Sequence, residues 1–238
     1  AEEANDVGQS HGFDANYINP VFFVSSFGPS KPAPDHTLFG FNGKYKILNK
    51  TTVYGQFLYD QASSTDSTKG SRYAWQIGFR GSDLFKISRL NYLFEYNTSK
   101  PYTYSSQYPI VNYSQLSEPL ADPLGSDYKE LVGILNYSIG KFDLQGQINY
   151  AKYATGTAQL TGAAGTNLAP GIISSGQSFT NTLKYAEGTI AYVLNPKYNL
   201  RIEVGGLLRQ STSSVSDTKT AMFIFGLRST FRDLYHDF

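Results

Sequence analysis

A strict alternation between apolar and polar residues is the feature that most constrains the fold of this chain. Between Phe142 and Ala151, one set of alternate residues is Phe, Leu, Gly, Ile and Tyr, and the other is Asp, Gln, Gln, Asn and Ala. Successive side chains of a β-strand point to opposite faces, so such a segment has one apolar and one polar face. The pattern returns in segments of about ten residues, which is the length at which a tilted strand crosses a bilayer.

The alternation, together with the positions of turn-forming residues, predicts about ten strands. Residues 16–27 alternate only weakly and contain Pro20, which central strands rarely accept. In the best segments, nearly every charged residue in the middle of the strand falls on one face, which leaves the other face apolar. The predicted strands cover residues 16–27, 37–47, 51–61, 72–80, 89–98, 130–139, 142–153, 185–194, 198–210 and 219–231.

The connections between these strands are sorted by length. Short connections fall at residues 48–50, 81–88, 140–141 and 195–196, and longer ones fall near 28–36, 62–70, 99–129, 154–181 and 211–218. The two kinds alternate along the chain, so the short ones all lie at one end of the predicted strands. Bacterial outer-membrane barrels have short periplasmic turns and long outer loops, whereas a soluble sandwich has no reason to sort its loops.

We therefore predict an all-β fold, an antiparallel transmembrane β-barrel in the outer membrane of a Gram-negative bacterium. Its apolar faces would contact membrane lipid and lipopolysaccharide. Its C-terminus would be periplasmic, and the long loops near 99–129 and 154–181 would be extracellular. Residues 1–238 would form a single barrel domain or the C-terminal part of a larger barrel. The first residues lack the features of a signal peptide, so we expect a leader to have been removed or a front part to precede them.

Composition agrees with this prediction. The 19 Tyr, 16 Phe and 22 Gly suit short strands with aromatic girdles, although a soluble β-sandwich would share this composition. The mean hydropathy of −0.32 does not argue against a membrane, because alternating residues cancel in the average. The net charge is +1 and no basic run is present, so nucleic acid is not an expected partner.

The sequence shows no pattern typical of an enzyme or a metal site. Cysteine is absent, and His11, His36 and His236 lie in predicted loops or chain ends without the pattern of a triad or a zinc site. A protease at the outer rim is the third-ranked function, and His36 beside Asp35 is its candidate. We predict no enzymatic activity, no cofactor and no metal.

Charged residues on the polar faces balance in sign and are expected to face the barrel interior. One interpretation is a network of salt bridges and hydrogen bonds that fills a narrow lumen. The other is a polar pore or a groove that binds sugars. These residues include Asp60, Arg72, Arg80, Glu95, Asp143, Glu187, Arg201, Glu203 and Arg209.

Residues 99–129 form the most distinctive predicted loop, because tyrosines there are interleaved with Ser, Asn and Gln. Tyrosine rings can stack on sugar faces while amides bind hydroxyls, so this composition suits a glycan. The alternative is a self-packed loop that caps the lumen. The predicted glycan contacts are Tyr102, Tyr104, Asn112 and Tyr113.

Three runs of residues in and beside this loop carry a family resemblance: EYNTSKPYTYS at 95–105, NYSQ at 112–115 and PLADPLGSDYKE at 119–130. HGFDANYINP at 11–20, VYGQFLYDQ at 53–61 and LYHDF at the end extend it along nearly the whole chain. The sequence resembles the C-terminal half of the Wzi-type capsule assembly family, most closely its gliding-motility RemB-like branch. It departs from that branch at Lys100, where the branch has Arg, and at 114–115 and Asp122, where the branch has His.

The resemblance implies a barrel of about eighteen strands, of which this chain would supply the last ten or so. It also implies a non-enzymatic, lectin-like protein that helps to bind or assemble surface polysaccharide. Gliding motility, or a larger envelope complex with other outer-membrane proteins, is a further implication. The alternative function is a passive outer-membrane pore of about ten strands.

Overall fold

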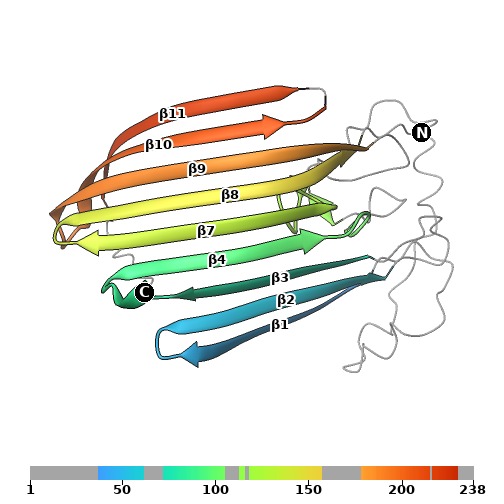
Figure 1. The fold of residues 1–238 in the computed structure, drawn as a ribbon, viewed down its shortest axis with the longest axis horizontal. Coiled ribbons are helices and arrows are strands. Elements are labelled where there is room, and N and C mark those ends of the chain that lie inside the picture. Colours follow the sequence, from blue (N-terminus) through green and yellow to red (C-terminus); the bar gives the residue numbers. More distant parts are fainter. Residues whose placement is uncertain are drawn as a thin grey trace, which may run out of the picture.

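The computed structural model describes residues 37–61, 72–104, 113–115, 118–156, 178–214 and 216–229. Within them, nine strands form one antiparallel sheet, and each strand pairs with the strands that precede and follow it in the sheet order (Figure 1). The sheet is not closed. Its strands are β1 (Thr37–Leu48), β2 (Thr51–Gln61), β3 (Tyr73–Gly81), β4 (Leu90–Ser99), β7 (Tyr128–Ile139), β8 (Phe142–Gly156), β9 (Ser178–Asn195), β10 (Leu200–Thr212) and β11 (Asp217–Arg228).

Two short strands and one helical turn complete the described structure. The strands β5 (Ser114–Gln115) and β6 (Glu118–Pro119) pair as a small separate hairpin between β4 and β7. The 3₁₀ turn η2 (Leu84–Lys86) lies in the connection between β3 and β4. No helix in the described ranges is long and apolar enough to cross a membrane.

The predicted all-β antiparallel fold is confirmed, and each predicted strand from residue 37 onward has a counterpart in the sheet. The predicted strand at 16–27 lies outside the described residues. The connections at 49–50, 82–89, 140–141 and 196–199 all join strands at one end of the sheet, which we call the turn end. The connections at 62–72, 100–127, 157–177 and 213–216 join them at the other end, which we call the loop end (Figure 1).

Two predicted boundaries at the loop end are wrong. The loop expected at 154–181 is shorter, because β8 runs to Gly156 and β9 already begins at Ser178. The connection expected at 211–218 is a tight turn, in which the Ser213 N–H donates to the Ser216 carbonyl oxygen at 2.8 Å. In both places the strands continue as paired backbone beyond the point where their apolar alternation stops.

The register places every apolar run on one face of the sheet. The residues in question are the alternate ones of 39–47, 53–59, 73–79, 90–96, 131–139, 142–150, 186–194, 202–208 and 221–227, and together they form what we call the apolar belt. Aromatic rings pair across strands within it, as in Trp75 and Tyr96, whose centroids are 5.1 Å apart. The intervening residues form the opposite, polar face.

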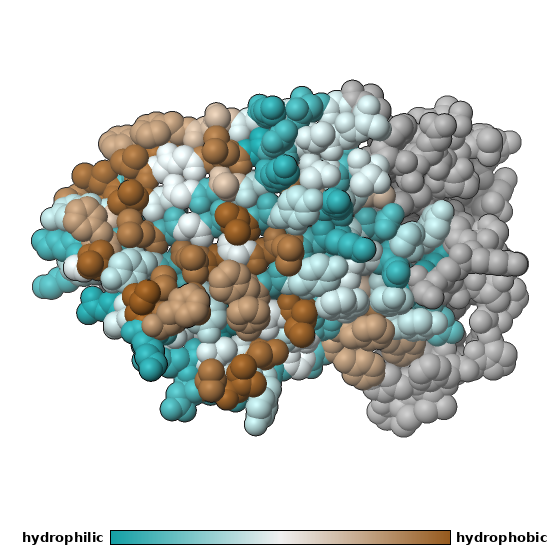
Figure 2. Space-filling model, in the orientation of Figure 1, coloured by the Kyte–Doolittle hydropathy of each residue, from teal (hydrophilic) through white to brown (hydrophobic). Residues whose placement is uncertain are grey.

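Burial is inverted relative to a water-soluble sandwich. Ile148 and Leu208 of the apolar belt are 63% and 62% exposed, whereas Asp60 and Asn97 of the polar face are 2% and 7% exposed. A sandwich would bury the belt against a second sheet. No second layer covers it in the part of the chain that the structure describes (Figure 2).

The apolar belt crosses the sheet obliquely. On β2 and β3 it reaches Tyr59 and Tyr73 at the loop end. Residues paired in sequence with Tyr73 across β4, β7 and β8 lead to Thr180 on β9. On β9, however, the belt begins only at Ala186, six residues nearer the turn end. A belt of constant height on tilted strands must shift in register from strand to strand in this way.

Two glycines on the polar face of neighbouring strands provide a test of this packing. A Cβ atom at Gly205 would lie 2.7 Å from the Gly188 carbonyl oxygen, whereas one at Gly226 would meet nothing within 4 Å. Gly205→Ala should therefore lower the free energy of unfolding by about 1–3 kcal/mol, and Gly226→Ala should leave it nearly unchanged. Urea unfolding of the full-length protein in detergent measures both. Equal effects of the two substitutions would contradict the register of β9 and β10.

Candidate functional site

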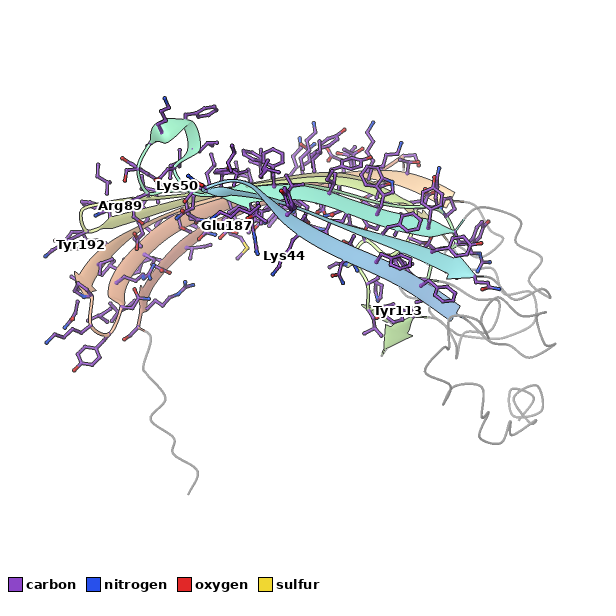
Figure 3. The ribbon with its side chains drawn as sticks, turned by 90° about the horizontal axis from the view of Figure 1, so that it is seen from below. Lys44, Lys50, Arg89, Tyr113, Glu187 and Tyr192 are labelled. Atoms are coloured by element: carbon purple, nitrogen blue, oxygen red, sulfur yellow. The ribbon has the colours of Figure 1, made fainter. Side chains whose placement is uncertain are left out.

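The segment after β4 folds back across the loop end of the polar face. Figure 3 shows Tyr113 and its hairpin on the side of the sheet toward which Lys44 and Glu187 point. Asp60 at the end of β2 holds this segment, because its Oδ2 accepts a hydrogen bond from the Tyr104 N–H at 2.7 Å. Thr103 is fully buried beside it, and its hydroxyl donates to the Tyr73 carbonyl oxygen at 3.4 Å.

Two of the predicted glycan contacts, Tyr104 and Tyr113, form a pair of neighbouring, tilted rings. The centroids of Tyr104 and Tyr113 are 6.1 Å apart and their planes differ by 30°. The Tyr113 N–H donates to the Tyr104 carbonyl oxygen at 3.0 Å, which fixes the two backbones together. Tyr104 is half-buried, and Tyr113 is 43% exposed. The pair therefore presents one supported aromatic surface to the outside, a feature that many carbohydrate sites share with other ligand sites.

The backbone of this segment adopts a conformation that tyrosines rarely take. Tyr102 and Tyr104 have φ angles of +62° and +72°, in the left-handed region that favours glycine. Such conformations cost of order 1–3 kcal/mol each and persist where the surroundings impose them, often at binding sites. The hydrogen bond that the Tyr104 N–H donates to Asp60, together with the buried Thr103, supplies that constraint here.

Acidic groups lie beneath the tyrosine pair. Burial raises the pKa of Asp122, whose carboxylate accepts hydrogen bonds from the Leu124 N–H at 2.8 Å and from the Tyr128 hydroxyl. Burial, Asp122 and Asp60 together raise the pKa of Tyr104 to about 12. The Tyr104 hydroxyl therefore stays protonated at neutral pH and can donate a hydrogen bond to a sugar hydroxyl.

The structure brings Tyr104 and Tyr113 together and places Tyr102 two residues before Tyr104 in the same turn. Asn112, the fourth predicted contact, lies outside the described residues. Asp60 was predicted only as an interior polar residue, and its role in holding the loop was missed. The sequence could not reveal that role, because its partner is a backbone N–H group 44 residues further along the chain.

A continuous chain of hydrogen bonds crosses the middle of the polar face. The Tyr54 hydroxyl donates to Glu95 at 2.5 Å, and Asn97 donates to Glu95 at 2.8 Å and to Glu130 at 3.2 Å. Asn149 also donates to Glu130, at 3.1 Å. The chain joins β2, β4, β7 and β8, so the polar face is a connected network.

Ion pairs link the far strands of the same face. Arg201 lies 3.5 Å from Asp143 and 3.7 Å from Glu203, and Glu203 lies 3.4 Å from Arg228. The structure places the remaining residues of that predicted set as follows. Arg80 lies on the polar face with its guanidinium 5.8 Å from the centre of the Tyr54 ring, Arg72 is buried next to β3, and Arg209 lies on the polar face of β10.

The sequence matches no protein-family model, and no curated protein or solved structure is significantly similar to it.

The hydrogen bond from Tyr104 to Asp60 can be tested by exchange of backbone amides. Asp60→Ala removes a charged acceptor, which is worth about 1.5–3 kcal/mol, so amide exchange in residues 102–104 should accelerate on the order of tenfold to 100-fold. Asp60→Asn keeps an acceptor oxygen and should restore most of the protection. Hydrogen exchange measured by mass spectrometry on the full-length protein distinguishes the three forms. Unchanged exchange in Asp60→Ala would show that Asp60 does not hold the loop.

Proposed function

We propose that the sheet is part of the wall of an outer-membrane β-barrel and that the tyrosine pair at its loop end binds a surface polysaccharide. The observation that carries the membrane part is the exposed apolar belt opposite a hydrogen-bonded polar face. The observation that carries the polysaccharide part is the supported pair of Tyr104 and Tyr113. The resemblance to Wzi-type capsule assembly proteins supports the same function.

The chemistry of the belt supports contact with hydrocarbon. Its residues are Ala, Gly, Val, Leu, Ile, Phe, Tyr and Trp alone, with no charged or amide side chain on any of the nine strands. A lysine or arginine facing lipid at the bilayer midplane costs about 2–4 kcal/mol. A sheet that faced water would have no reason to exclude these residues from one whole face. The oblique course of the belt is that of strands tilted in a bilayer.

A pair of adjacent residues on β8 tests the membrane location. Ile148 lies in the middle of the apolar belt, and Gln147 lies next to it on the polar face. Ile148→Arg should lower the free energy of unfolding in lipid vesicles by about 2–4 kcal/mol, whereas Gln147→Arg should have a much smaller effect. Unfolding in urea, followed by tryptophan fluorescence, measures both. A wild-type protein that is stable and monodisperse in water without detergent would contradict the proposal.

The polysaccharide site rests on stacking and hydrogen bonding together. The exposed face of Tyr113 can stack on the apolar face of a sugar ring, and its position is fixed by Tyr104 beneath it. The hydroxyl of the half-buried Tyr104 and the acidic groups around it offer a donor and acceptors for sugar hydroxyls. Rigid aromatic surfaces with a few fixed polar groups lose little entropy on binding.

Replacement of the exposed ring tests this site. Tyr113→Ala should weaken binding to any glycan that the wild-type protein recognises on a glycan array by at least tenfold, equivalent to about 1.4 kcal/mol. Tyr198→Ala is the matched control, because Tyr198 is an exposed tyrosine at the opposite, turn end of the sheet. Unchanged binding after Tyr113→Ala would remove the site.

The second candidate function is a passive pore, which the polar face favours because such a face can line a water-filled channel. The hydrogen-bonded network on the same face fits a filled interior equally well. Conductance in planar bilayers separates the two functions. A polysaccharide-binding barrel with a filled or plugged interior gives little current, whereas an open pore conducts.

A further inference from the structure

A row of lysines borders the apolar belt at the loop end. On each of four strands, the first residue beyond the belt on the same face is a lysine: Lys129 beside Leu131, Lys152 beside Tyr150, Lys184 beside Ala186 and Lys219 beside Ala221. We call these four residues the lysine rim. On β10, which lies between β9 and β11, the corresponding residue is Gln210.

The rim follows the belt rather than the register of the strands. Lys129 and Lys152 are directly opposite each other, but on β9 the partner of Lys152 is Thr182 and the lysine is shifted to Lys184. The end of the belt makes the same shift, because Tyr150, its last residue on β8, pairs with Lys184, whereas the belt on β9 begins at Ala186. Figure 2 shows the corresponding change from hydrophobic to hydrophilic side chains toward the loop end. The lysines therefore lie at a constant height above the belt, which is what a planar boundary requires.

Protein groups leave much of this positive charge uncompensated. Like charges directly opposite each other on a sheet repel, as Lys129 and Lys152 must do. Lys219 pairs with Asp217 at 3.7 Å, and Asp127 lies near Lys129. In the part of the chain that the structure describes, Lys152 and Lys184 make no ion pair. An external anion that lay against this row would reduce the repulsion between its lysines.

We propose that the lysine rim binds the phosphate groups of anionic lipid headgroups in the leaflet next to the loop end. This inference rests on the proposed membrane location. The aliphatic part of a lysine can lie along the apolar belt while its ammonium reaches the headgroup level. A groove on β9–β11 has Lys184, Gln210 and Lys219 at one end and Ala186, Leu208 and Ala221 at the other. The small alanines leave room there for an acyl chain below a phosphate.

A lipid fits this row better than a free phosphate or an acidic protein does. The lysines are spread along a line across β7 to β11 and do not converge on one point, as a site for a single free anion would require. The surface next to them is apolar, so an occupant must match charge and hydrocarbon at once. A phosphorylated lipid has both parts in that order.

The test compares two variants with the same change in charge. Lys129, Lys152 and Lys184 are replaced together by Gln in the rim variant, and Lys86, Lys141 and Lys197, which are exposed at the turn end, are replaced together by Gln in the control. Binding of full-length protein to mixed micelles that contain lipid A is measured by native mass spectrometry. The rim variant should bind lipid A at least tenfold and up to roughly 100-fold more weakly than the control variant, since each lysine near an anionic surface contributes severalfold. Replacement of the same three residues by Arg should retain binding.

Three results would overturn the proposal: equal binding of lipid A by the rim and control variants, equal binding of dephosphorylated lipid A by the wild-type protein, or displacement of lipid A by inorganic phosphate alone. Insertion into vesicles is measured for every variant. A wild-type protein that fails to insert refutes the proposed barrel. Variants that insert and bind glycan normally but do not differ in lipid binding refute only the lysine rim.

Discussion

An apolar sheet face without a covering layer is the constraint on which the rest of the structure depends. Residues such as Ile148 and Leu208 are more than half exposed, and an apolar surface that spans nine strands far exceeds what soluble monomers expose. In the proposed membrane location, hydrocarbon would cover this face. Such a location requires charges to lie on the opposite face or beyond the ends of the belt, and that is where they lie.

The carboxylates of the polar face are hydrogen-bonded. Removing a carboxylate from water is costly unless it is hydrogen-bonded, and the half-buried Glu95 and Glu130 accept hydrogen bonds from Tyr54, Asn97 and Asn149. The same holds for Asp60 at the loop end, where the buried carboxylate accepts a hydrogen bond from the Tyr104 N–H. The tyrosine pair is therefore held by a hydrogen bond to the polar face of the sheet, and its geometry depends on that bond.

The sequence predicts strands only where apolar and polar residues alternate. The nine strands were predictable because each has one apolar and one polar face, so that apolar and polar residues alternate along it. Residues 178–184 and the turn at 213–216 were mispredicted, because the apolar alternation of the belt stops before them and only pairing with the neighbouring strand shows that the chain is extended. For the site, aromatic density predicted Tyr104 and Tyr113, whereas the anchor at Asp60 depends on a contact distant in sequence.

Strand direction decides how this sheet can close. Adjacent strands are antiparallel throughout, so the first and last of nine, β1 and β11, run in the same direction. These two edges cannot complete an antiparallel ring with each other, and unpaired edge groups are not tolerated in hydrocarbon. An antiparallel ring therefore needs an odd number of further strands. The strand predicted at 16–27 would supply one, and the larger barrel implied by the Wzi-type resemblance, of about eighteen strands, would also satisfy the parity. The nine strands alone do not, so a barrel in which every neighbouring pair is antiparallel needs strands beyond these nine.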